Sequence, residues 1–65
     1  NAFAQEQLSL MYLLGIGFPQ DFVLGHMWSN ICGSGGNKDC VEIRNTIEKK
    51  MTPSQLEKAQ EMARN

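Results

Sequence analysis

The residues best suited to chemistry in this 65-residue chain are its two cysteines and its single histidine. Cys32 and Cys40 are separated by seven residues, three of which are glycines. If these seven residues form a tight turn between two antiparallel helices, the cysteines come within the Cα separation of about 5–6 Å that a disulfide requires. The alternative is two free thiols in small apolar positions. The spacing is not the two-residue separation of thiol oxidoreductases, so a catalytic redox role is not expected.

A metal site or a catalytic site is not predicted. His26 precedes Cys32 by six residues, which places the two side chains on different faces of a helix and argues against zinc. One histidine must serve four serines, and none of them stands at a spacing that suggests a nucleophile and its base. Gly15 and Gly17 lack the further glycine or lysine of a phosphate-binding loop. We therefore expect no enzyme activity, cofactor or metal, and we expect His26 to be a surface histidine or a ligand contact in a groove.

The overall composition narrows the class of protein. Hydrophobic residues make up 42% of the chain and charged residues 20%, which is typical of a small globular domain. The net charge of −1 gives no electrostatic reason to bind nucleic acid or an anionic membrane. No apolar run approaches the roughly 20 residues of a membrane span. The chain begins with Asn and shows no signal peptide, so we interpret it as a mature or trimmed fragment.

The charged residues are distributed unevenly. Residues 1–36 contain only Glu6 and Asp21 and no Lys or Arg, whereas the other eleven charged side chains follow. A solvated helical hairpin needs more charge than this, so we expect its apolar faces to pack on more than one neighbour. The prediction is a homodimer with the first helix as its contact surface. The alternative is that further residues upstream of this fragment cover that surface.

The spacing of apolar residues predicts four helices and no strand. The expected ranges are 2–14, then 20 or 21 to 31 or 32, then 38–50, and finally 53–63. Glycines at 15 and 17 are expected to adopt positive φ in the first turn, and the stretch 33–37 is too rich in glycine for a helix interior. Gly25 is expected to let a neighbouring helix approach closely.

Three helix starts carry capping signals. Asp21 and Asn37 are expected to cap the second and third helices. Thr52 and Gln55 have the spacing of a capping box, with Pro53 in the first helical position. Trp28 is expected to lie in the core between the first two helices.

These features together resemble the Sel-1-like repeat, a helical hairpin of about 36 residues related to tetratricopeptide repeats. The match covers residues 4–40, and the residues after it resemble the closing segment of such arrays. Departures stand at Ser9, Gly25 and Ser29, where the family usually has glycine, alanine and an aromatic residue. The signature positions are Gly15, Gly17, Pro19, Asp21, Trp28 and Gly36.

The resemblance implies a single domain of antiparallel helical hairpins in an α-α superhelix. Residues 1–36 would be one repeat, and 37–65 a degenerate partial repeat with a closing helix. Secreted bacterial members carry cysteine pairs with this spacing as inter-helix disulfides, which supports a bond and a periplasmic or secreted location. Without the bond, a cytoplasmic location is expected.

The implied function is a non-enzymatic adaptor that holds a protein or peptide partner in a concave groove. Gln5, Tyr12 and His26 are the candidate partner contacts. One alternative is a structural end-cap of a longer repeat protein, since terminal repeats need a polar outer face. A small-ligand binder or enzyme is the remaining alternative.

Overall fold

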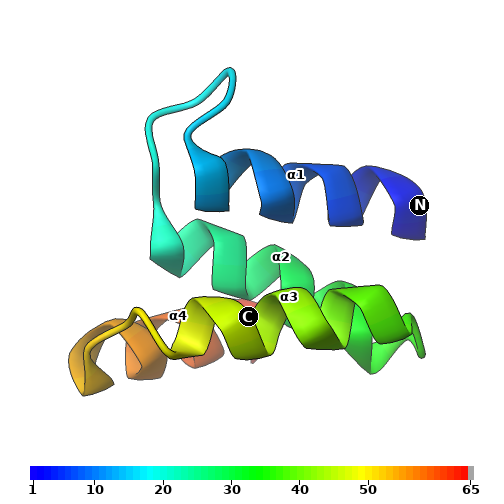
Figure 1. The fold of residues 1–65 in the computed structure, drawn as a ribbon. Coiled ribbons are helices and arrows are strands. Elements are labelled where there is room, and N and C mark those ends of the chain that lie inside the picture. The colour runs from blue at the N-terminus through cyan, green and yellow to red at the C-terminus, as the bar shows by residue number, and fades with distance from the viewer. Residues whose placement is uncertain (65) are drawn as a thin grey trace.

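A computed structural model describes residues 1–64, which fold into four α-helices (Figure 1). The helices are α1 (Ala2–Leu14), α2 (Phe22–Ser34), α3 (Lys38–Glu48) and α4 (Pro53–Arg64). No strand occurs among the residues described. The prediction of an all-α fold with about four helices is therefore confirmed.

The predicted capping residues set the starts of the last three helices. Asp21 and Asn37 each accept a hydrogen bond on a side-chain oxygen from the backbone N–H three residues later, at 3.1 and 3.0 Å. Thr52 and Gln55 form the reciprocal capping box. The backbone N–H of Gln55 donates to the Thr52 hydroxyl at 3.1 Å, and the Thr52 N–H donates to the Gln55 side chain at 2.9 Å. These bonds satisfy donors that a helix start leaves without partners.

The end of α2 differs from the prediction, because the helix continues through Gly33 and Ser34. Gly33 was interpreted as a turn residue, yet it lies inside the last turn of the helix. A Cβ atom at this position would lie 3.1 Å from Cγ2 of Val41. The glycine therefore serves the close approach of α3 rather than a break in the backbone.

The end of α3 also differs, because the helix stops at Glu48 and not at Lys50. The N–H of Lys50 donates to the carbonyl of Ile47 at 2.9 Å, which is a bond to the third residue back. Such bonds tighten the chain beyond a helix terminus and close it off.

The turn between α1 and α2 is fixed by its glycines and by bonds back to α1. Gly15 and Gly17 have φ values of 71° and 78°, as predicted. The Gln20 side-chain amide donates to a carbonyl in the last turn of α1 at 2.8 Å, and the Asp21 N–H donates to the Tyr12 carbonyl at 2.9 Å. Left-handed glycine at a helix end lets the chain reverse without a Cβ clash.

Helix α2 is the centre of the fold and packs against each of the other three helices (Figure 1). It carries no Asp, Glu, Lys or Arg. Four of its residues are buried, namely Gly25, His26, Ser29 and Cys32. The lack of charge in this helix thus follows from burial within the chain, and α2 has the several neighbours that its composition predicts.

Gly25 is the point where three helices meet. A Cβ atom on this residue would lie 3.2 Å from Cδ1 of Ile47 in α3 and 3.4 Å from the Ser9 carbonyl oxygen in α1. It would also lie 3.5 Å from the Tyr12 Cβ. Ile47 fills this site and is fully buried. The prediction that Gly25 permits close helix approach is confirmed.

Candidate interaction surface

The two cysteines form a disulfide that joins α2 to α3. Their Cα atoms are 5.8 Å apart, and both side chains are buried. The Cys32 sulfur also lies 3.5 Å from the backbone oxygen of Ala2. Since the sulfur is bonded and carries no proton, this is a packing contact that places the disulfide beneath the start of α1. The sulfurs are therefore structural groups in this state and cannot act as thiolate ligands or nucleophiles.

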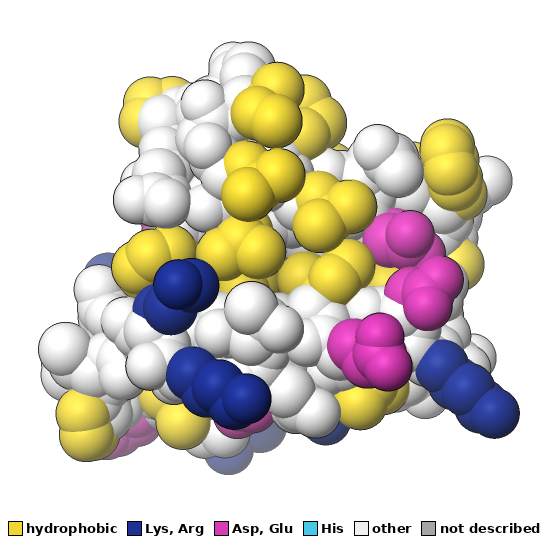
Figure 2. Space-filling view, in the orientation of Figure 1, with side chains coloured by type: hydrophobic (Ala, Val, Ile, Leu, Met, Phe, Trp, Pro, Cys, Tyr) yellow, Lys and Arg dark blue, Asp and Glu magenta, His cyan; other side chains and the backbone are white. Residues whose placement is uncertain are grey.

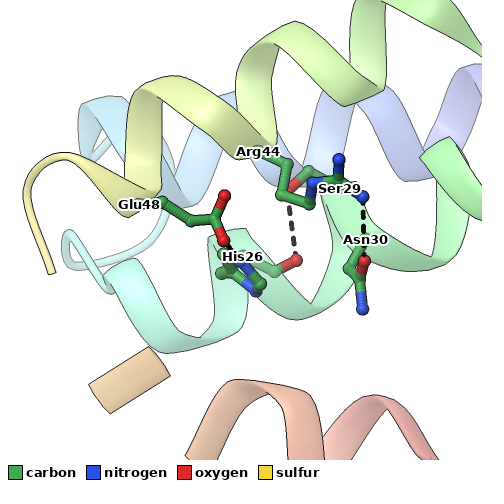
Figure 3. Close-up of polar contacts among 5 residues, drawn as sticks. All are labelled: His26, Ser29, Asn30, Arg44 and Glu48. Atoms are coloured by element: carbon green, nitrogen blue, oxygen red, sulfur yellow. Dashed lines mark hydrogen bonds and ion pairs between the residues drawn. The ribbon is translucent and has the colours of Figure 1, made fainter. Parts of the chain in front are cut away.

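His26 is not a surface residue, and that prediction is wrong. Its side chain is 1% exposed. It points from α2 toward Glu48 of α3, with 3.4 Å between Nε2 and the nearer carboxylate oxygen (Figure 3). The contact lacks hydrogen-bond geometry, so neither ring nitrogen has a hydrogen-bond partner within residues 1–64. Because α2 is covered on several sides, a polar residue on it is buried with its apolar neighbours and is not available to a partner.

The polar contacts around His26 lie where α2 packs against α3 (Figure 3). Arg44 donates to the Asn30 side-chain oxygen at 3.2 Å. The Ser29 hydroxyl donates to the His26 carbonyl at 3.0 Å within α2. The first bond connects two helices and the second satisfies a buried hydroxyl, so both have structural roles.

The exposed large hydrophobic side chains of the described chain all lie in α1 and the turn after it. They are Phe3 (70% exposed), Leu14 (60%), Ile16 (58%) and Phe18 (36%). Phe3, Leu10 and Leu14 stand seven and four residues apart, so they lie on one stripe along α1. Yellow side chains gather over α1 and its junction with α3 in Figure 2. We call Phe3, Leu10, Leu14 and Ile16 the open stripe.

The remaining predicted partner contacts lie on a different side of α1. Gln5 and Tyr12 are seven residues apart, share one helix face and are half-buried. The Tyr12 ring stacks on Phe18 with 4.7 Å between ring centres, and its Cβ lies near Gly25. Tyr12 therefore supports the turn and the α1–α2 contact. The structure brings Gln5 and Tyr12 onto one face but places His26 beneath, on α2.

Gly36 and Trp28 are two further signature residues of the predicted repeat. Gly36 has a φ of 100°, in the left-handed region that favours glycine. Trp28 is half-buried rather than fully enclosed, so its core role is partial.

The predicted partner contacts were Gln5, Tyr12 and His26, and none of them belongs to the open stripe. The signal was present, since Phe3, Leu10 and Leu14 repeat at helical spacing in a segment without Lys or Arg. Only the packing shows which of the two apolar sides of α1 is turned toward α2 and which remains exposed.

Comparison of the chain with sequence models of protein families, with curated proteins and with solved structures finds no match. The resemblance to Sel-1-like repeats therefore stays a prediction. Among residues 1–64, no helix has the length and apolar content needed to cross a bilayer.

Proposed function

We propose that this chain is a non-enzymatic protein-interaction module whose contact surface is the open stripe. The observation that carries the proposal is the grouping of the exposed large hydrophobics in residues 3–18, where Phe3 and Leu14 are 70% and 60% exposed. Grouped exposed apolar side chains on a folded domain are typical of surfaces that bind another molecule. Full burial of one such side chain contributes about 1.5–3 kcal/mol.

A protein or peptide partner fits this surface better than a lipid membrane. Helices that bind membrane surfaces usually carry Lys or Arg beside their apolar face, to attract anionic lipid headgroups. Residues 1–36 contain no Lys or Arg. An uncharged apolar stripe is instead suited to the desolvated centre of a protein interface.

We also propose that the module works in an oxidising compartment, such as a periplasm or the exterior. The support for this is the Cys32–Cys40 disulfide, because such bonds form and persist where thiols are not kept reduced. If the chain is Sel-1-like, α3, α4 and the turn between them form the closing segment, which agrees with the eleven charged residues in this part of the chain. An end-cap of this kind leaves α1 as the surface that meets another molecule.

Site-specific photo-crosslinking tests the proposal. A photoreactive phenylalanine analogue replaces Phe3 in one variant and the exposed Gln60 of α4 in a matched control. We expect covalent adducts from position 3 and few from position 60, because only the first lies on the open stripe. Adducts at equal yield from both positions, or none from position 3, would contradict the proposal. The mass of the adduct also separates a second copy of the chain from a different protein.

A further inference from the structure

The exposed charges of α3 and of the two residues after it are unevenly distributed along the helix. Lys38, Asp39 and Glu42 lie near its start and sum to −1, whereas Lys49 and Lys50 follow its end and sum to +2, and all five are exposed. Figure 2 shows the same arrangement on the face that α1 and α3 form. Acidic side chains lie at one end, basic ones lie at the other, and hydrophobic side chains occupy the middle. One further basic side chain lies at the lower edge beyond the acidic group.

This arrangement is complementary to itself. When two copies meet face to face across a two-fold axis, the same patch is used twice and the helices run in opposite directions. The acidic start of α3 in one copy then faces the basic end of α3 in the other, and this happens at both ends of the contact. Opposite charges in these positions favour association and fix the orientation. The open stripe, which has no charge, lies between them.

We propose that the occupant of the open stripe is a second copy of this chain, bound across a two-fold axis with the two α3 helices antiparallel. The proposal rests on the proposed function, since it names the partner of that surface. A second copy necessarily supplies both features that this face needs: an apolar stripe for the centre and opposite charges for the two ends. A different protein would have to match both features independently.

The size of the molecule limits the area that this dimer can bury. The chain extends over 27 × 25 × 21 Å, so its largest face offers roughly 700 Å² of flat area. A standard interface buries about 800 Å² on each partner. Nearly the whole face must take part to reach this area, so we expect a weak, reversible dimer.

Sedimentation equilibrium of the oxidised 65-residue chain, from about 10 µM to about 1 mM, measures this association. We expect a monomer–dimer equilibrium in the wild type. Leu14→Glu should weaken it at least tenfold, because a carboxylate would enter the apolar centre without a partner. Gln60→Glu on α4 adds the same charge elsewhere and should change the constant by no more than about twofold. Leu14 is 60% exposed, so its replacement leaves the fold intact, as circular dichroism would verify.

A charge exchange tests the antiparallel orientation. Glu42→Lys alone and Lys49→Glu alone should each weaken the dimer by about three- to fivefold at low salt, because each places like charges opposite one another. The double variant Glu42→Lys/Lys49→Glu restores opposite charges and should return to within about twofold of the wild type. An additive loss in the double variant would overturn the orientation.

A wild-type chain that remains monomeric up to about 1 mM, or an equal loss from Leu14→Glu and Gln60→Glu, would overturn the dimer. The crosslinking experiment then tells the two proposals apart. An adduct with a different protein from position 3 keeps the proposed function and ends the dimer proposal. A monomer without such an adduct ends both.

Discussion

The two ends of this molecule pack their helices against the same central helix, α2, but their outer surfaces differ. Helices α3 and α4 and the turn between them carry all eleven charges that follow residue 36, mostly on exposed positions. Helix α1 carries one charged residue, Glu6, and even this accepts a hydrogen bond from Asn37 at 3.2 Å. Its outer side exposes Phe3 and Leu14 instead. The apolar character of α2 is explained by its burial between the other three helices. The open stripe of α1 has no such explanation, because no other part of the described chain covers it.

A large effect is expected from removing the disulfide that joins α2 to α3. The double variant Cys32→Ala/Cys40→Ala should lower the free energy of unfolding by roughly 2–3 kcal/mol, the value expected for so small a loop. At about 4–8 °C per kcal/mol in a chain of this size, the melting temperature should fall by about 10–20 °C. Thermal unfolding followed by circular dichroism measures the change.

A reducing agent provides the control for this variant. It should lower the melting temperature of the wild type by a similar amount and leave the double variant unchanged. A wild type that melts at the same temperature with and without reductant would show that the bond contributes nothing to stability.

The next effect concerns Gly25, where α1 and α3 both contact α2. Gly25→Val should destabilise by about 1–3 kcal/mol, because the added atoms would press on Ile47 and on the α1 backbone. Gly35→Ala is the matched control, since a Cβ there meets only the Cys32 carbonyl oxygen, at 3.4 Å. Its φ of −81° suits alanine, so we expect a change within about 1 kcal/mol. Urea unfolding gives both values, and equal losses would mean that close helix contact at Gly25 is unimportant.

The outcomes for individual residues show what the sequence could and could not predict. Local signals performed well, because caps and left-handed glycines depend on neighbours in the chain. Asp21, Thr52 and Gly15 all behave as predicted. The prediction that Gly33 lies in a turn was wrong. Glycine can either end a helix or permit close packing, and only the position of Val41 shows that Gly33 does the second.

The candidate site was predictable only in outline. The first helix was expected to be the contact surface, and of the three residues predicted as partner contacts the structure buries His26 and leaves Gln5 and Tyr12 half-buried. His26 is polar but buried, since α2 is covered by three other helices. Tyr12 is engaged with Phe18. Which side of an apolar helix faces the core depends on long-range packing, which helical periodicity alone does not reveal when both sides are apolar.

The smallest expected change in the free energy of unfolding is that of Phe3→Ala, and it tests most directly whether the two ends of the molecule differ in purpose. If the open stripe serves an interface rather than the fold, Phe3→Ala should change the free energy of unfolding of the monomer by no more than about 0.5 kcal/mol, the range of ordinary surface substitutions. Ile47→Ala, in the buried junction of α2 and α3, should cost about 2–5 kcal/mol. Urea unfolding at low micromolar concentration measures both variants where the monomer dominates. A loss from Phe3→Ala comparable to that from Ile47→Ala would mean that α1 needs this ring to fold, and the apolar surface would then be explained by stability alone.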